Sequence, residues 1–238
     1  MRSEAAAATA ESERLRGKIE LLLPALLDAG RRLVAHPRIR ELYPEYLFRS
    51  HCIIRASVPL MGAARERAQA LAESDPVGGP LAAYLEGHIP EELRHDDWLL
   101  DDLEAVGVNR ESVLARIPPA AVASAVGAQY YWIFHAHPIA LLGYIALLEG
   151  YPPTTADVEQ LMAATGYGPE AFRTMRKHAE LDPHHREELD EAIDSFPLTP
   201  EQSSLMGVSA MYSVHALVHV IDELASSSRA VDGAGTTR

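Results

Sequence analysis

The spacing of apolar residues is the feature that most constrains the fold. These residues recur at intervals of three and four along most of the chain; Ile19, Leu22 and Leu26, for example, share one face of a helix. Runs that alternate apolar with polar residues, the pattern of a half-buried strand, are absent. The sequence therefore predicts an all-α protein. Its expected helices cover residues 19–33, 44–72 with a kink at Pro59, 80–106, 112–116, 120–148, 155–165, 169–194 and 200–226.

Length and composition favour a single globular domain. Of the 238 residues, 47% are hydrophobic and 23% charged, a mix that excludes a disordered or collagen-like chain. We expect a flexible segment over residues 1–12, a helical domain over residues 13–226 and a flexible tail over residues 227–238. Cys52 is the only cysteine, so a disulfide within the chain is excluded and the cytoplasm is the expected compartment.

The charge pattern bears on the partners. A formal net charge of −13 argues against binding to the phosphate backbone of a nucleic acid. Residues 117–148 carry no Asp, Glu, Lys or Arg, and this stretch is long enough to cross a bilayer. However, Gln129, His135 and Pro138 interrupt it, and no cluster of Lys or Arg flanks it. We interpret it as a central helix buried on most sides and expect no membrane partner.

Eleven histidines are the unusual feature of the composition, and neutral imidazole is the commonest metal ligand. Residues at positions i, i+4 and i+7 of a helix lie within a sector of ~60°, so their side chains point the same way. Three triplets of metal-type residues have this spacing: His88, Glu92 and His95; His178, Asp182 and His185; and His215, His219 and Asp222.

These triplets supply the ligand types that iron takes in proteins, imidazole together with carboxylate. Helical bundles complete such sites by gathering a Glu-x-x-His pair and further carboxylates from facing helices. Glu92 and His95 form such a pair, and Glu149 is a lone carboxylate at the end of the charge-free stretch. Carboxylates that met in an apolar interior without a metal would repel one another and lose their hydration.

Each pattern also has a purely structural interpretation. Charged helices often contain a Glu-x-x-His pair. Asp182 and Pro183 resemble the start of a new helix, and a break there would turn His185 away from His178. The triplet at residues 215, 219 and 222 is interpreted as histidines of the core.

Two other groups of side chains are open to both interpretations. Tyr131, Trp132 and His135 either wall a substrate pocket or pack in the core. His51 either adds a ligand or is packed inside the bundle.

Taken together, three segments resemble the heme-oxygenase-like non-heme iron oxidases and oxygenases. They are HIPEELRHDDWLLDDLEAVGV, HPIALLGYIALLEGYPP and HAELDPHHREEL, and the resemblance covers about residues 80–195. It implies a single-domain bundle of about seven helices, related in fold to heme oxygenase, thiaminase II and the pyrroloquinoline quinone synthase.

The resemblance also implies an activity and a set of ligands. Such enzymes use O2 and one or two Fe(II) ions for N-oxygenation, oxidative C–C cleavage or decarboxylation of a small organic substrate, and a homodimer is the expected assembly. His88 stands where several relatives have a carboxylate, so it joins His51 as an additional candidate. The positions that match the family's ligands are Glu92, His95, Glu149, His178, Asp182 and His185.

Two rival hypotheses remain at this stage. In the first rival hypothesis, the chain resembles a metal-free enzyme of the same fold. This enzyme is either a hydrolase similar to thiaminase II, with Cys52 as its nucleophile, or a cofactor-free oxidase. In the other rival hypothesis, the chain is a helical binding protein without catalysis, and its carboxylates pair with basic residues such as Arg94, Arg173 or Lys177.

Overall fold

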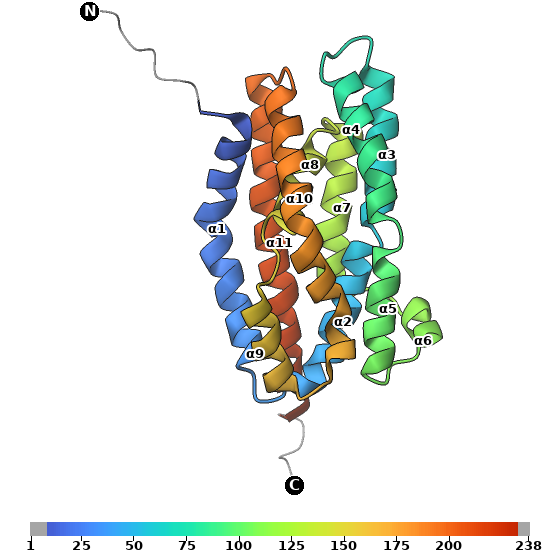
Figure 1. The fold of residues 1–238 in the computed structure, drawn as a ribbon, viewed down its shortest axis with the longest axis vertical. Helices are drawn as coiled ribbons and strands as arrows, with labels where there is room; N and C mark the ends of the chain where they lie inside the picture. Colours follow the sequence, from blue (N-terminus) through green and yellow to red (C-terminus); the bar gives the residue numbers. More distant parts are fainter. Residues whose placement is uncertain (1–8, 233–238) are drawn as a thin grey trace, which may run out of the picture.

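The computed structural model of the chain describes residues 9–232, except for the side chains of Pro183 and of residues 227–232 (Figure 1). Every regular element in these residues is helical, which confirms the prediction of an all-α protein. The elements are α1 (Glu11–Val34), α2 (Ile39–Ile54), α3 (Ser57–Leu71), α4 (Gly78–Glu92), α5 (His95–Ala105), α6 (Arg110–Ala115), α7 (Ala120–His135), α8 (Ala140–Gly150), α9 (Thr155–Thr165), the 3₁₀-helix η1 (Pro169–Phe172), α10 (Arg173–Ser195) and α11 (Pro200–Asp232).

The two chain ends differ slightly from the predicted boundaries. Helix α1 begins inside the segment predicted as flexible, and Ser12 is buried, with its backbone N–H and its hydroxyl each donating a hydrogen bond to Asp194. Helix α11 continues to Asp232, beyond the predicted end at residue 226. Residues 1–8 and 233–238 of the predicted flexible segments lie outside the described part of the chain.

Three of the eight predicted helices are each split into two α-helices, and the one expected over residues 169–194 begins as the 3₁₀-helix η1. The described residues therefore form more helices than the seven or so that the resemblance implies. The helix expected over residues 120–148 is interrupted before Pro138, because a residue that precedes proline avoids the α conformation. The helix expected over residues 44–72 breaks at Arg55 and Ala56. The predicted kink at Pro59 is therefore wrong: Pro59 lies in the first turn of α3, where a backbone N–H needs no helical partner.

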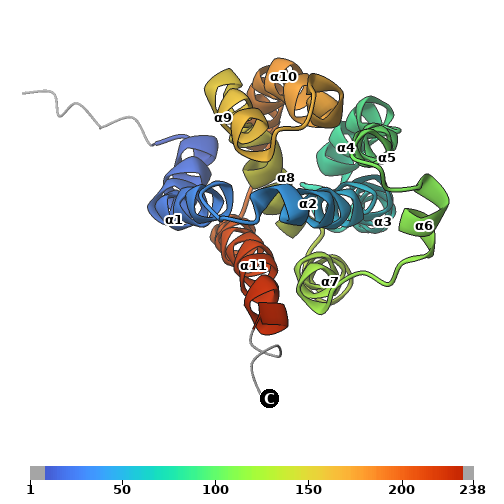
Figure 2. The same ribbon diagram turned by 90° about the horizontal axis from the view of Figure 1, so that it is seen from below.

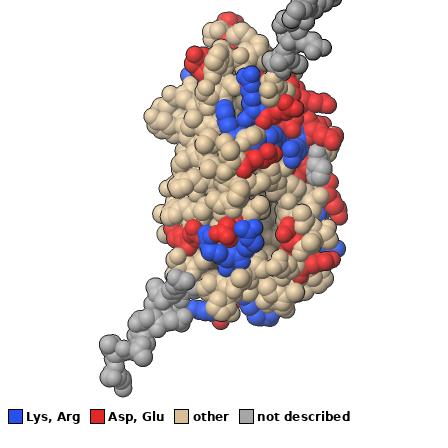
Figure 3. Space-filling view, turned by 90° about the vertical axis from the view of Figure 1, so that its left-hand side faces the viewer, with Lys and Arg blue, Asp and Glu red and all other residues tan. Residues whose placement is uncertain are grey.

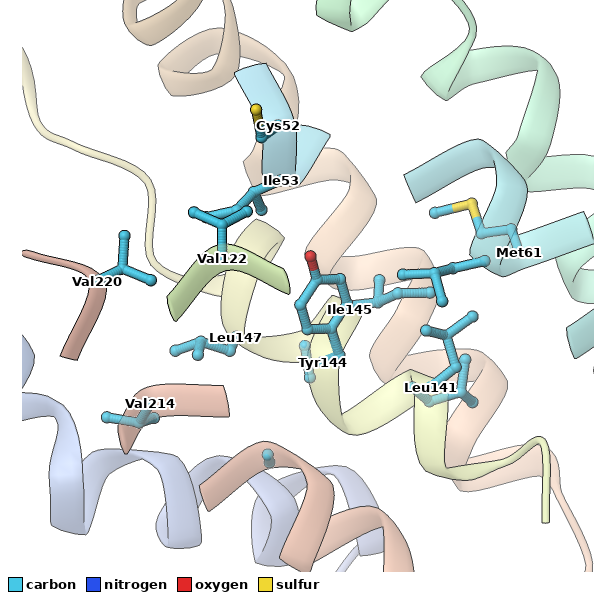
Figure 4. Close-up of a cluster of buried hydrophobic side chains, with 14 of the residues drawn as sticks. Cys52, Ile53, Met61, Val122, Leu141, Tyr144, Ile145, Leu147, Val214 and Val220 are labelled. Carbon is cyan, nitrogen blue, oxygen red and sulfur yellow. The ribbon is translucent and has the colours of Figure 1, made fainter. Parts of the chain in front are cut away.

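The second half of the charge-free stretch forms the centre of the bundle. All residues of α8 except Leu148 are buried, and α8 contacts α1, α3, α7, α10 and α11 (Figure 2). Figure 4 shows Tyr144 and Ile145 of α8 among buried side chains that include Ile53 of α2 and Val122 of α7. The first half, α7, is buried on one face only. The prediction of a single buried helix thus holds for α8 alone.

Specific contacts hold the far end of α8 in place. The guanidinium of Arg16 on α1 donates to the carbonyl of Ala146 and bonds Asp190 on α10. Arg186 on α10 donates to the carbonyl of Gly150 at 3.1 Å. The Gly150 carbonyl is one of those that the end of a helix leaves without a helical partner, and the cations suit the negative end of the helix. They anchor the turn of α8 that carries Glu149.

One described helix, α11, is long and apolar enough to cross a membrane. Its mean hydropathy reaches 1.4 in a window of Pro200–Ser226 of which 44% is buried. A core helix meets the same criterion, and α11 packs against α1 and α8. It carries no Asp, Glu, Lys or Arg between Glu201 and Asp222. Figure 3 shows a broad uncharged area on this side of the molecule, next to mixed patches of acidic and basic side chains.

Candidate metal centre

Seven side chains from four helices converge at one place inside the bundle. They come from the end of α4, the start of α5, the end of α8 and the middle of α10, although the first and last of them, His88 and His185, are 97 residues apart in sequence. His178 is half-buried and the other six are buried. The group comprises His88, Glu92, His95, Glu149, His178, Asp182 and His185, and we call it the candidate metal centre.

A helix break shapes the first part of this centre. The sequence predicts one helix over residues 80–106, but α4 ends at Glu92 and α5 begins at His95. Leu93 between them is extended, and Arg94 has φ of 70°, the one positive value at a non-glycine residue among residues 9–232. A left-handed residue is costly for any side chain other than glycine, so the turn is a strained feature of the kind that occurs at functional sites.

The chain still brings the first triplet together across this break. Glu92 Oε2 lies 3.2 Å from His95 Nδ1. His88 Nε2 shares a hydrogen bond of 3.0 Å with Glu149 Oε1. One ligand atom each from His88, Glu92 and Glu149 can be chosen so that all three lie within 4.8 Å of one another, a separation that a single metal ion can bridge.

The second triplet faces the first from α10. This helix continues through residue 183, so Asp182 and His185 both stay buried, and the predicted alternative of a break at Pro183 is wrong. His185 Nδ1 lies 3.7 Å from Glu92 Oε1. His178 donates a hydrogen bond of 2.9 Å from Nδ1 to the Thr174 carbonyl. This bond fixes the tautomer, so the lone pair of Nε2 can bind a metal.

The imidazole rings of the two triplets pack edge to face. The ring centres of His88 and His185 are 5.2 Å apart at an angle of 83°. The same separation, 5.2 Å, and an angle of 85° relate His95 and His178. The four rings therefore form two nearly perpendicular pairs, each of which joins one histidine of the first triplet to one of the second.

Several buried polar atoms in this centre have no hydrogen-bond partner among the described residues. They are His95 Nδ1, Glu149 Oε2, Asp182 Oδ1 and His185 Nδ1. Burying a polar group without a hydrogen bond costs roughly 1–3 kcal/mol, so a functional explanation is needed for four of them in one place. All four are ligand types for a divalent cation such as iron, which would satisfy them together. The donor set thus fits a bound metal.

The pKa values describe the same electrostatic conflict. Burial, with the charges of Glu149 and Glu92, raises the pKa of Asp182 to about 8. Burial also raises the pKa of Glu149, against the opposing effect of its bond with His88. For His88, burial acts to lower the pKa, but the bond to Glu149 and the surrounding carboxylates raise it to about 9. In the metal-free protein Asp182 and His88 therefore hold protons at neutral pH, which offsets the charge of the carboxylates.

The structure leaves other predicted side chains outside the centre. His51 is fully buried, and neither ring nitrogen has a hydrogen-bond partner among the described residues. The charges that act on it are those of Arg55, Asp96, Asp97 and Arg110. It therefore belongs to the α2–α5 interface.

The predicted pocket wall of Tyr131, Trp132 and His135 is also outside. Tyr131 and His135 are exposed on α7, and Trp132 is half-buried against Tyr212. The expectation that they wall a pocket inside the bundle is wrong, because this face of α7 points outward.

The third triplet lies on the surface. His215 and His219 are exposed on α11, and Asp222 pairs with Arg32 of α1 at 2.7 Å. The interpretation of these histidines as core residues is therefore wrong, since the buried face of α11 is the one that carries Met206, Ala210 and Val214.

Two aromatic residues at the centre were not predicted. The ring of Tyr84 stacks on His88 with centres 5.5 Å apart, and its buried hydroxyl has no described partner. Trp98 stacks on His95 with centres 4.0 Å apart and meets His178 edge to face at 5.9 Å. Both lie one helical turn from a triplet histidine, and this spacing is the signal that could have identified them.

Comparison with solved structures shows the heme oxygenase-like fold. A domain of unknown function with this fold from Shewanella denitrificans OS217 aligns with a TM-score of 0.79 and 17% identity, over 95% of this chain and 97% of that one. A CADD-like protein of unknown function, from Nostoc punctiforme PCC 73102, aligns with a TM-score of 0.68 and 15% identity, over 91% of this chain and 98% of that one. A TenA homolog from Pseudomonas syringae pv. tomato DC3000 aligns with a TM-score of 0.62 and 13% identity, over 86% of this chain and 91% of that one.

Comparison by sequence identifies the family. No curated protein matches the chain. A family model described as "iron-containing redox enzyme" matches residues 68–214, a span that includes α4, α5, α8 and α10 and hence the whole candidate metal centre. With more than half of its residues matched by this model and a heme oxygenase-like fold, the chain belongs to the family of iron-containing redox enzymes.

Proposed function

We propose that the protein is an O2-dependent non-heme iron oxidase or oxygenase that acts on a small organic substrate. One or two Fe(II) ions would be held by Glu92, His95, Glu149, His178, Asp182 and His185, with His88 as a further donor. The observation that carries the proposal is the set of buried ligand atoms without partners at the meeting point of α8 and α10. Membership of an iron-containing redox family supports the choice of metal.

The charge of the donor set is consistent with this metal. Three carboxylates and neutral imidazoles would leave a net charge of +1 beside two Fe(II) ions, whereas the same carboxylates without a cation repel one another in a buried site. When bound, ferrous iron would supply the electrons for O2 reduction and the open coordination positions at which O2 and substrate meet.

The chain's own residues prepare the site for that chemistry. The Thr174 carbonyl orients the ring of His178. The stacked rings of Tyr84 and Trp98 fix the planes of His88 and His95, respectively, and exclude water from one side of each. The arginines that anchor the end of α8 hold Glu149 against the α10 ligands. A rigid set of ligands of this kind binds metal with little reorganisation.

The rival hydrolase hypothesis has less support. A nucleophilic cysteine needs a depressed pKa and access to its substrate. Cys52 is buried, and burial raises the pKa of its thiol. Figure 4 shows it beside apolar neighbours at the edge of the core cluster. The likeness to the TenA homolog, at 13% identity, concerns the fold alone.

The test is anaerobic loading of metal-free protein with Fe(II), followed by measurement of iron per chain and of the visible spectrum after O2 is added. We expect one to two irons per chain, lost in Glu92→Gln and in His185→Ala. The adjacent His184→Ala is the matched control, because His184 is exposed. Among the described residues it pairs with Glu188 at 3.3 Å, and its ring centre lies 6.5 Å from that of His185. Iron content that is negligible, or that both site variants retain, would contradict the proposal.

A further inference from the structure

A pocket with basic walls lies directly outside the candidate metal centre. It opens between the start of α5, the short helix α6 and the start of α10, which Figure 1 shows at the lower right of the bundle. Its volume is about 470 Å³. Sites for small molecules typically enclose ~300–1,000 Å³, so the size suits a small organic ligand. The charged side chains that line this basic pocket are Arg94, Arg110, Arg173 and Lys177, with Asp97 and Asp101.

The lining has more positive than negative groups, in a protein whose overall charge is −13. Four cations face two carboxylates. Asp97 accepts from Arg94 at 2.9 Å and from Arg110 at 3.2 Å, and Asp101 accepts from Arg110 at 2.6 Å and from Arg173. Outside the lining, Glu104 lies 3.8 Å from Arg110. Each guanidinium has five N–H donors, so the arginines retain donors that these bonds do not use.

Lys177 is the strongest indication of a ligand. It forms no ion pair with any residue in the described part of the chain, although carboxylates lie close by in the same pocket. Its ammonium group lies instead 3.9 Å from the centre of the Trp98 ring. A cation on an aromatic face at the wall of a pocket, next to arginines with unused donors, provides the groups that bind a carboxylate.

Trp98 connects the pocket with the candidate metal centre. The half-buried indole lines the pocket and also stacks on His95 and meets His178. One ring thus separates the pocket from two proposed iron ligands. A molecule bound in the pocket would lie one side chain away from the metal.

We propose that the basic pocket binds a small organic carboxylate, and that it holds an anionic substrate beside the metal centre. The second half of this inference rests on the proposed function; the binding of a carboxylate does not. Lys177 and Arg173 recognise the anionic group, and Trp98 contacts the organic part.

The experiment measures binding of named probes by calorimetry, first to metal-free protein and then to protein loaded with Fe(II) without O2. The probes are benzoate and hexanoate, with benzamide as the neutral analogue of benzoate and inorganic phosphate as a purely inorganic anion. The variants are Lys177→Gln and Arg173→Gln. The matched control is Arg176→Gln, which removes an exposed positive charge from the same helix outside the pocket.

A spectroscopic readout locates the bound probe. The chain has two tryptophans, so Trp132→Phe leaves Trp98 as the only indole. We expect benzoate and hexanoate to change its fluorescence saturably and benzamide to have no such effect. Loss of one charged hydrogen-bond donor should weaken carboxylate binding roughly tenfold in Lys177→Gln and in Arg173→Gln. Arg176→Gln should bind as the unaltered protein does, and added salt should weaken binding throughout.

Three results would overturn the inference. The first two are no saturable binding of either carboxylate, and binding that Lys177→Gln leaves unchanged. The third is phosphate that binds as tightly as both carboxylates, which would show a general anion site. The proposed function fails separately, because it is judged by iron content. If the protein binds carboxylates but no iron, the carboxylate site stands and its link to catalysis is contradicted. If it binds iron but no carboxylate, the proposed function stands and the carboxylate site alone is contradicted.

Discussion

The side chains of Glu92 and His95 meet across a break between two helices. Glu92 is the last residue of α4 and His95 is the first of α5, yet their Oε2 and Nδ1 atoms are 3.2 Å apart. Leu93 between them is extended and Arg94 is left-handed. Beyond this turn both side chains still meet α10, Glu92 at His185 and His95 at His178. A local backbone conformation, and not helical periodicity, therefore sets this half of the candidate metal centre.

Substitution of Arg94 tests the role of that conformation. Glycine adopts a φ of 70° without the cost of about 1–2 kcal/mol that a side chain incurs. We therefore expect Arg94→Gly to keep the iron content and to raise the free energy of unfolding by up to about 1 kcal/mol. The ion pair with Asp97 that it loses contributes little, because the Arg94 side chain is 82% exposed. Arg94→Val introduces a β-branched side chain and should lower both the iron content and the free energy of unfolding. Urea unfolding and iron analysis of the two variants check this, and equal values in both would contradict it.

The pKa of Asp182 predicts how the stability of the metal-free protein depends on pH. The carboxyl group has a pKa of about 8 in the fold against an ordinary value of 3.8, so the folded state holds an extra proton between these limits. The free energy of unfolding should therefore fall as pH rises through this window, by up to about 1.4 kcal/mol per pH unit from this group.

Asp182→Asn isolates that contribution, because asparagine is close in shape and stays neutral. The variant should become progressively more stable than the unaltered protein between pH 4 and pH 8, in denaturant titrations without metal. A difference between the two proteins that stays constant with pH would show that Asp182 is not the group concerned. Iron loading should reverse the order, since the bound metal would favour the carboxylate.

The bond between His88 and Glu149 predicts a coupled effect on stability. Both groups are buried, and His88 Nε2 and Glu149 Oε1 are 3.0 Å apart, so removal of one side chain leaves the other buried without its hydrogen-bond partner. His88→Ala should lower the free energy of unfolding of the metal-free protein by about 3 kcal/mol at neutral pH. The loss should be smaller in a Glu149→Gln background, and a double-mutant cycle measures the difference. Additive losses would contradict the pairing.

Gly143 tests the packing that positions α8. A Cβ atom there would overlap the carbonyl of Met206 and lie 2.8 Å from the nitrogen of Ala210, both on the backbone of α11. Because backbone cannot move aside as a flexible side chain can, Gly143→Ala should destabilise the protein by about 3 kcal/mol. Gly127→Ala on the exposed face of α7 meets nothing within 4 Å and should stabilise it by about 0.5–1 kcal/mol. Thermal unfolding of the two variants checks the contrast; losses of similar size in both would contradict it.

The sequence by itself determined the helical class and the chemical candidates. Helical periodicity is a local property, and so is the i, i+4, i+7 spacing that selected the triplets around Glu92 and Asp182. Glu149 could be identified because it ends an apolar stretch without charges. The heme oxygenase-like fold, expected from three short segments, was confirmed by comparison over almost the full chain.

Only the tertiary structure decided which candidates meet. The third triplet has the same spacing as the second but lies on the surface. Helix α11 is apolar on more than one face, so its contacts with α1 and α8 decide which face is buried. For the same reason Tyr131 and His135 point outward, while His88 joins the carboxylates. The left-handed turn at Arg94 and the unbroken helix through residue 183 depend on packing that outweighs local preference. Local sequence thus supplied the ligand types, and long-range packing brought them to one point.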